Sequence, residues 1–178
     1  MQEKKPPHNT ARLFLALCPG EDVRAALTTH SDTWQWTAAA ARYAPPDWHV
    51  TLHFIGSVAR ERLDELRAGL AVPITPFELH LGQAALWPHG LAVLCPAALP
   101  EGLQQLHARL GQALQRLGLK TDARPYRPHI TLARHAQDAV APLPRCVIDW
   151  PVEGYVLMES GGQVAQRYRV LQQYRAVA

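Results

Sequence analysis

The sequence His-Val-Thr-Leu at residues 49–52 returns almost unchanged as His-Ile-Thr-Leu at residues 129–132. Both stretches open apolar runs that follow proline-bearing segments, which is typical of β-strands. Side chains alternate between the two faces of a strand, so each copy should present its histidine and its threonine together on one face. The opposite face carries only apolar side chains and can be buried. The pattern therefore predicts two strands that each expose an imidazole and a hydroxyl.

Helices and strands alternate along the rest of the chain. The run 12–18 predicts a buried strand, a helix is predicted over 21–42, and the first motif strand is expected over 48–55, ending at Gly56. Adjacent strands that can pair antiparallel, with helices covering one face, indicate an α+β fold. The other expected elements are helices at 60–70 and 99–117, the latter stopped by Gly118, strands at 77–81, 91–95, 153–158 and 167–173, a strand containing His129, and turns at 87–90 and 160–162.

The composition is that of an ordinary globular protein. The chain has 178 residues, 48% of them hydrophobic, and a formal charge of +3, which allows a polyanionic partner without requiring one. We expect residues 1–10 to be disordered and residues 11–178 to form one domain. Cys18, Cys95 and Cys146 lack metal-ligand spacing, which favours reduced thiols in a cytoplasmic protein. No run approaches the ~20 apolar residues of a membrane span.

Two histidines that face one cleft suit an in-line displacement at phosphorus. One imidazole takes a proton from the attacking oxygen while the other gives a proton to the departing oxygen, and histidine can serve either role near neutrality. The hydroxyls of Thr51 and Thr131 could donate hydrogen bonds to non-bridging phosphate oxygens. Arg134, which follows the second motif directly, could offset the charge of those oxygens. Neither a metal nor another cofactor is needed for this scheme.

The motifs and their flanks resemble the 2H phosphoesterase superfamily. Within it, the chain is most similar to the bacterial and archaeal RNA 2',3'-cyclic phosphodiesterases, also called 2'-5' RNA ligases. The resemblance implies a bilobal α+β fold with a pseudo-twofold axis, in which duplicated antiparallel sheets carry helices on their outer faces and line a central cleft. The matching stretches are Arg-Leu-Phe-Leu-Ala-Leu at 12–17, Trp-His-Val-Thr-Leu-His-Phe-Ile-Gly at 48–56, Arg-Pro-Tyr-Arg-Pro-His-Ile-Thr-Leu-Ala-Arg at 124–134, and the tail at 159–171.

The resemblance also implies an activity. A terminal 2',3'-cyclic phosphate on RNA, for example on a tRNA fragment, would be opened to a 2'-phosphate without a metal, and 2'-5' linkages would be joined or split by the same transfer. By motif, His49 is the proton donor toward the 3' oxygen and His129 the proton acceptor toward water, with Thr51, Thr131 and Arg134 holding the phosphate. We expect a cytoplasmic monomer that needs no cofactor and does not contact a membrane.

Four more residues are candidates for base or RNA contact. Phe14 matches an aromatic that can stack on the terminal base, although an apolar strand can also bury it in the core. His53 should share the face of the first motif and either reach the cleft or support it from behind. Tyr126 stands where the family commonly has phenylalanine and could bring a hydroxyl near the cleft. Arg127 could line the RNA entrance or be an ordinary surface arginine.

Two other functions fit parts of the pattern. A non-catalytic module could use the same cleft to hold phosphorylated RNA ends. A metallohydrolase could use His49, His53 and His129 as ligands, but the sequence offers neither a His-Asp cluster nor a His-x-x-x-His helix to support it.

Overall fold

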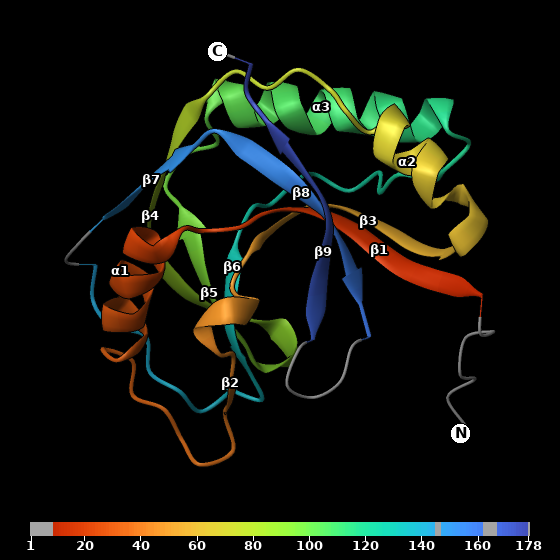
Figure 1. Cartoon of the computed structure of the whole chain (residues 1–178). Coiled ribbons are helices and arrows are strands. Elements are labelled where there is room, and N and C mark those ends of the chain that lie inside the picture. Colours follow the sequence, from red (N-terminus) through yellow and green to blue (C-terminus); the bar gives the residue numbers. More distant parts are fainter. Residues whose placement is uncertain (1–8, 145–146, 162–166, 178) are drawn as a thin grey trace.

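The computed structural model describes residues 9–144, 147–161 and 167–177. Within these residues nine strands form one antiparallel sheet in the order β7-β4-β5-β6-β3-β1-β8-β9, with β2 beside β6 (Figure 1). The strands are β1 (Thr10–Leu17), β2 (Ala41–Arg42), β3 (Val50–Ala59), β4 (Phe77–Trp87), β5 (Leu91–Pro96), β6 (Ile130–Arg134), β7 (Ile148–Val152), β8 (Gly154–Ser160) and β9 (Tyr168–Arg175).

The sheet has the duplicated layout that the resemblance implies. Outward from the central pair β6–β3, one half continues through β5, β4 and β7 and the other through β1, β8 and β9. Each central strand follows a strand and a helix, α1 (Glu21–Ser31) before β3 and α3 (Glu101–Arg116) before β6. The helix α1, which precedes β3, packs against β7 of the other half of the sheet. The helix α3 packs against β3 and β4, above the sheet in Figure 1. The predicted α+β class with two related halves is confirmed.

The predicted helix over 99–117 is confirmed as α3. Its leucine stripe is buried against the sheet, which removes apolar side chains from water along the whole helix. Gly118 follows with a φ of 73°, a left-handed conformation that glycine adopts without strain and that commonly ends helices. The predicted helix over 60–70 is present as the 3₁₀ turn Arg60–Arg62 followed by α2 (Leu63–Gly69). None of the helices in the described residues is long and apolar enough to span a membrane.

The helix predicted over 21–42 is wrong in its second half. It ends at Ser31, where the last carbonyls accept bonds from the following turn. The Thr33 N–H and hydroxyl both donate to the His30 carbonyl, at 2.9 and 2.6 Å, and the Ser31 carbonyl accepts from the Trp34 N–H at 3.4 Å and the Trp36 indole at 2.8 Å. Such side-chain bonds satisfy helix-end groups and compete with further turns of helix. The chain then turns and forms β2 before the 3₁₀ turn Pro45–Asp47 that leads into β3.

Several predicted boundaries also change. β3 runs through Gly56, whose φ of 87° lies at an irregularity in the β1–β3 pairing, so the prediction that this glycine ends the strand is wrong. The edge strand β7 and the short β2 were not predicted. Thr10 begins β1, whereas residues 1–8 of the expected disordered segment lie outside the described residues, as do Gly162 and Cys146. The predicted domain limits stay predictions.

Candidate active site

The two motif strands meet at one residue pair, Val50 of β3 and Ile130 of β6. In an antiparallel pair, the residue before one member lies opposite the residue after the other, and both project to the same face. The flanking motif residues therefore form a square above the Val50–Ile130 pair. Both central side chains are fully buried on the other face, so the register is fixed by the core.

The square places His49 opposite Thr131 and Thr51 opposite His129. The two histidines occupy one diagonal and the two threonines the other. Diagonal neighbours on one face of a sheet have Cα atoms about 7–8 Å apart, which leaves room for a small anion between the two imidazoles. The pseudo-twofold axis of the fold passes through this space. The sequence predicted one imidazole and one hydroxyl on a shared face in each motif, and the structure brings both pairs to one surface.

Each imidazole is held by the same backbone contact. Nδ1 of His49 lies 2.8 Å from the carbonyl oxygen of Asp47, and Nδ1 of His129 lies 2.8 Å from that of Arg127. A carbonyl oxygen can only accept, so Nδ1 carries the hydrogen in both rings. Nε2 is therefore the nitrogen with a free lone pair when the ring is neutral. In both copies the accepting carbonyl lies two residues before the histidine, so the two halves hold their histidines in the same tautomer.

Burial lowers the pKa of both histidines. For His49 the bond to the Asp47 carbonyl opposes this effect, the nearby His129 lowers the pKa further, and the Asp47 carboxylate raises it. For His129 the bond to the Arg127 carbonyl opposes burial, and the Arg127 guanidinium lowers the pKa further. Both rings are thus neutral at neutral pH in the free protein. The charge next to the two rings differs in sign, because the Asp47 carboxylate lies near His49 and the Arg127 guanidinium lies near His129.

Aromatic rings hold His49 in place from two sides. Its ring centroid lies 5.1 Å from that of Phe14 and 5.0 Å from that of Tyr168, which meets it edge-on. Phe14 comes to the site as predicted, but it is only 3% exposed, so it supports the imidazole and offers little surface to a base. Tyr168 begins β9 and was not predicted as a site residue. Its position depends on strand pairing that no local pattern reveals.

His129 packs on Trp87, the last residue of β4, with ring centroids 4.4 Å apart. The Arg127 guanidinium carbon also lies 4.4 Å from the centroid of the Trp87 ring, a cation–π distance. Arg127 therefore lies at the site. Of the two interpretations offered from the sequence, a residue lining the entrance and an ordinary surface arginine, its position fits the first. Trp87 was recognised only as part of a turn, although a tryptophan beside a hairpin turn is a signal that could have marked it.

Arg134 lies beyond the His49–Thr131 end of the square. Its Nε donates to the Tyr43 hydroxyl at 2.5 Å, and the Tyr43 backbone N–H donates to the Leu132 carbonyl at 2.8 Å. Arg167 also reaches this end, with its guanidinium carbon 5.1 Å from the Tyr43 ring and its Nε 4.0 Å from an Asp47 carboxylate oxygen. Two guanidiniums thus flank Tyr43. Tyr43 was missed from the sequence. Arg167 lies in the tail at 159–171 that resembles the family, but it was not predicted as a site residue.

A β-bulge follows the motif in β3. Thr51 pairs with Ala16 of β1, but the next pair is His53 with Leu15, so Leu52 is an extra residue. A bulge of this kind puts two successive side chains on one face and reverses the alternation beyond it. His53 therefore lies on the core face with Leu15, and the prediction that it shares the face of His49 and Thr51 is wrong.

The second motif strand has the same bulge. Thr131 pairs with Val93 of β5 and Ala133 with Ala92, so the extra residue is Leu132. The next residue after each bulge returns to the cleft face, and this residue is Arg134 in β6 and Phe54 in β3. Both are exposed, Phe54 to 73%. They occupy equivalent positions in the two halves, at opposite ends of the square.

Three stacked rings pack against the β3 bulge, and all three line the cavity beside the square. His53 and His107 of α3 lie 4.0 Å apart at 16°, and His107 and Tyr126 lie 4.0 Å apart at 18°. His53 Nε2 contacts the His107 carbonyl oxygen at 2.8 Å, and the Tyr126 hydroxyl donates to the Thr51 carbonyl at 2.9 Å. The Tyr126 hydroxyl thus acts on the backbone of a motif residue. Burial, with the neighbouring His53, lowers the pKa of His107 to about 4.

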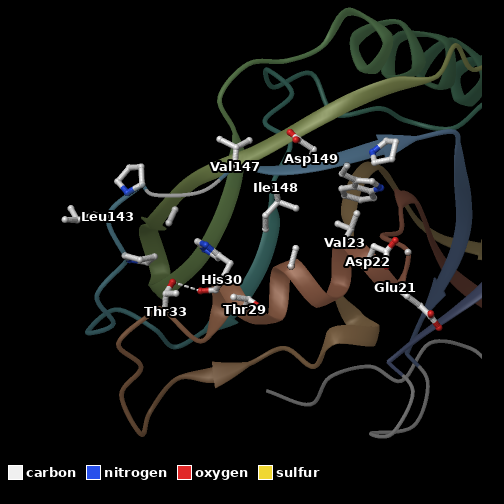
Figure 2. A pocket seen from close by; sticks show the side chains of 18 residues that line it. Glu21, Asp22, Val23, Thr29, His30, Thr33, Leu143, Val147, Ile148 and Asp149 are labelled. Carbon is white, nitrogen blue, oxygen red and sulfur yellow. Dashed lines mark hydrogen bonds between the residues drawn. The ribbon is translucent and has the colours of Figure 1, made fainter.

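A cavity of about 490 Å³ adjoins the square at Thr51 and His129. A larger one, of about 960 Å³, lies between α1 and β7, where Val23 and His30 of the helix face Ile148 (Figure 2). No motif residue lines the larger cavity. The three-histidine metal site does not form, because His53 faces α3. Within the described residues no group of three His, Cys, Asp or Glu side chains is placed to hold a metal ion.

The duplicated fold and the crossed pairs of histidine and threonine define a 2H phosphoesterase. A family model described as the 2'-5' RNA ligase superfamily matches residues 25–153, and the chain belongs to this family. It is 33% identical over 166 residues to the RNA 2',3'-cyclic phosphodiesterase of Thermus thermophilus, covering 84% of this chain and 81% of the relative.

Two further comparisons concern Escherichia coli proteins. The RNA 2',3'-cyclic phosphodiesterase of strain K12 is 33% identical over 133 residues, 72% of this chain and 74% of the relative. The crystal structure of E. coli LigT complexed with 3'-AMP superposes with a TM-score of 0.83 at 26% identity, covering 95% of this chain and 99% of that one. The similarity thus extends over nearly the whole fold.

Proposed function

We propose that the protein is an RNA 2',3'-cyclic phosphodiesterase that opens a terminal cyclic phosphate to a 2'-phosphate by acid–base catalysis, without a metal or other cofactor. The observation that carries this proposal is the diagonal pair of histidines, each tied at Nδ1 to a backbone carbonyl and each with Nε2 free. Relatives of similar length are named for this activity, and E. coli LigT has been solved with 3'-AMP, a nucleotide with a phosphate on the ribose.

The charges around the two rings support separate roles. The Arg127 guanidinium disfavours the charged form of His129, which suits a base that takes a proton from water. The Asp47 carboxylate favours the charged form of His49, which suits an acid that gives a proton to the 3' oxygen. A bound phosphate diester adds a negative charge between the rings and favours protonation of His49 further.

The reaction then follows in one displacement. Water loses a proton to Nε2 of His129 and forms a bond to phosphorus, while the bond from phosphorus to the 3' oxygen breaks and that oxygen takes a proton from His49. In this scheme the Thr51 and Thr131 hydroxyls donate to the non-bridging oxygens, and Arg134 offsets their charge from one end of the square. A ribose hydroxyl in place of water would make a 2'-5' linkage, so the same site can support reversible joining.

The test is product analysis on an RNA that ends in a 2',3'-cyclic phosphate. We expect a 2'-phosphate as product, in the presence of excess chelator, from any RNA fragment that presents this end. A non-catalytic end-binding module would instead bind the RNA and leave it closed when protein is in excess. A 3'-phosphate product would overturn the assignment of His49 to the 3' oxygen, and loss of activity on chelation would overturn the metal-free scheme.

A further inference from the structure

The cavity of about 490 Å³ lies at one end of the catalytic square. It is bordered by the Thr51–His129 edge, whereas Arg134 lies beyond the opposite edge. Its volume is within the range of about 300–1,000 Å³ that is usual for small-ligand sites. Its lining combines three groups of side chains: the stacked rings of His53, His107 and Tyr126, the Asp122–Arg124 ion pair, and the cleft-face residues Thr51, Phe54, Trp87, Arg127 and His129.

Phe54 forms one wall of this cavity and is unusually exposed for a large apolar side chain. The β3 bulge turns its ring to the cleft face, where it is 73% exposed although the ring of buried Phe14 lies only 6.3 Å away. Its counterpart in the other half is Arg134, so the two ends of the cleft differ in kind: one is cationic and the other aromatic. An exposed aromatic ring beside catalytic groups is suited to stacking on a nucleobase, since every base presents a π-face.

The opposite wall combines an aromatic ring with a charge. Trp87 supports His129, and the Arg127 guanidinium lies 4.4 Å from the Trp87 ring centroid. Arg127 forms no ion pair with an acidic side chain of the described residues, whereas the neighbouring Arg124 is held by Asp122 through bonds of 2.5–3.0 Å. Two aromatic rings and one uncompensated cation match a nucleoside that is attached to a phosphate.

In the proposed mechanism His129 handles the attacking oxygen, so an occupant of this cavity lies on the attacking side of phosphorus. We infer that the cavity is the binding site of an acceptor nucleoside, whose 5'-hydroxyl replaces water. That hydroxyl would give its proton to His129 and bond to phosphorus, the bond from phosphorus to the 3' oxygen would break, and His49 would protonate that oxygen. The reverse reaction cleaves a 2'-5' linkage into a cyclic phosphate and a 5'-hydroxyl. This inference rests on the proposed function.

The experiment compares two substrates that differ only in the acceptor nucleoside. Adenosine 2',3'-cyclic phosphate lacks it, and the 2'-5'-linked adenosine dinucleotide has it. For Phe54→Ala and Phe54→Leu, kcat/KM on the dinucleotide should fall about 5- to 150-fold relative to kcat/KM on the cyclic phosphate, the range that base stacking supplies. Phe54→Trp keeps a ring and should keep the ratio within about threefold of the wild type. Leu143→Ala, at an equally exposed apolar residue beside the α1–β7 cavity, is the matched control and should leave both rates unchanged.

The outcomes separate this inference from the proposed function. If the wild type opens the cyclic phosphate but Phe54→Ala leaves the ratio unchanged, the cavity does not bind the acceptor nucleoside. Equal losses on both substrates would place the terminal nucleoside in the cavity instead and would also overturn the inference. Failure of the wild type to open the cyclic phosphate at all would overturn the proposed function itself.

Discussion

Replacing His107 by phenylalanine should make the protein more resistant to acid. His107 is stacked between His53 and Tyr126, and burial together with the neighbouring His53 lowers its pKa to about 4. Phenylalanine keeps a flat ring of similar width in the stack but cannot bind a proton. The substitution therefore removes the titration and retains most of the packing, which makes it a specific probe of this buried group.

The sign and size follow from the difference between the folded and unfolded pKa values of His107. In the unfolded chain an ordinary histidine has a pKa of about 6.5, so below that pH the unfolded state binds a proton that the folded state does not bind. Stability is therefore full above pH 6.5 and is lost as the pH falls toward 4. With a folded pKa of about 4, His107 alone accounts for about 2 kcal/mol of lost stability between pH 7 and pH 5. Because water partly reaches the ring, we expect about 1–2 kcal/mol.

The measurement is urea unfolding of the wild type and His107→Phe at pH 7 and pH 5. The wild type should lose about 1–2 kcal/mol more than the variant over this range. His135→Asn is the matched control, since His135 is exposed, with a φ of 52° that asparagine tolerates, and it should retain the wild-type loss. If His107→Phe and the wild type lose the same free energy, His107 does not carry the acid sensitivity and the reasoning is refuted.

Four further outcomes concern the reaction itself. His49→Ala and His129→Ala should each lower kcat by about 10²–10⁴-fold with the fold retained by circular dichroism, and a wild-type rate in either would remove that histidine from the mechanism. Thr51→Val should lower kcat/KM by less than either histidine variant, because one of several donors is lost. Arg134→Ala should mainly raise KM for the cyclic phosphate, which initial-rate kinetics would show. Asp47→Asn removes the negative charge that raises the pKa of His49, so the alkaline limb of the kcat/KM profile should move to lower pH, and an unmoved limb would contradict the acid role of His49.

Local pattern predicted much of the fold because most elements are amphipathic. The leucine stripe of α3 and the apolar runs of β1 and β5 identify helix and strands without any knowledge of their partners. The end of α1 was missed because indole and hydroxyl groups help to close it. The edge strand β7 was missed because it is only five residues long and carries Pro151, although its buried and exposed residues alternate strictly. Residues such as Tyr43 and Tyr168 reach the site through strand pairing, which the sequence does not display.

The faces of the motif strands show why resemblance and alternation gave different answers. Strict alternation places His53 on the same strand face as His49 and Thr51, and Arg134 on the far side of β6, whereas the bulges at Leu52 and Leu132 do the opposite. A bulge is set by pairing with the neighbouring strand, so its effect is invisible in either motif alone. Arg134 was predicted from its place directly after the second motif and again from the family resemblance, which already includes the consequence of the bulge.

The same pair of bulges also explains how a symmetric scaffold can bind an asymmetric substrate. The duplication fixes the histidines, the threonines and both Nδ1 contacts in equivalent places, so in the proposed reaction phosphorus would meet nearly identical groups from each half. A phosphodiester, however, has different groups on its two sides. The first cleft-facing position after each bulge is where the halves diverge, with Arg134 in one and Phe54 in the other. Exchanging these two side chains would leave the square intact, so it should change substrate orientation and preference while the acid–base pair remains in place.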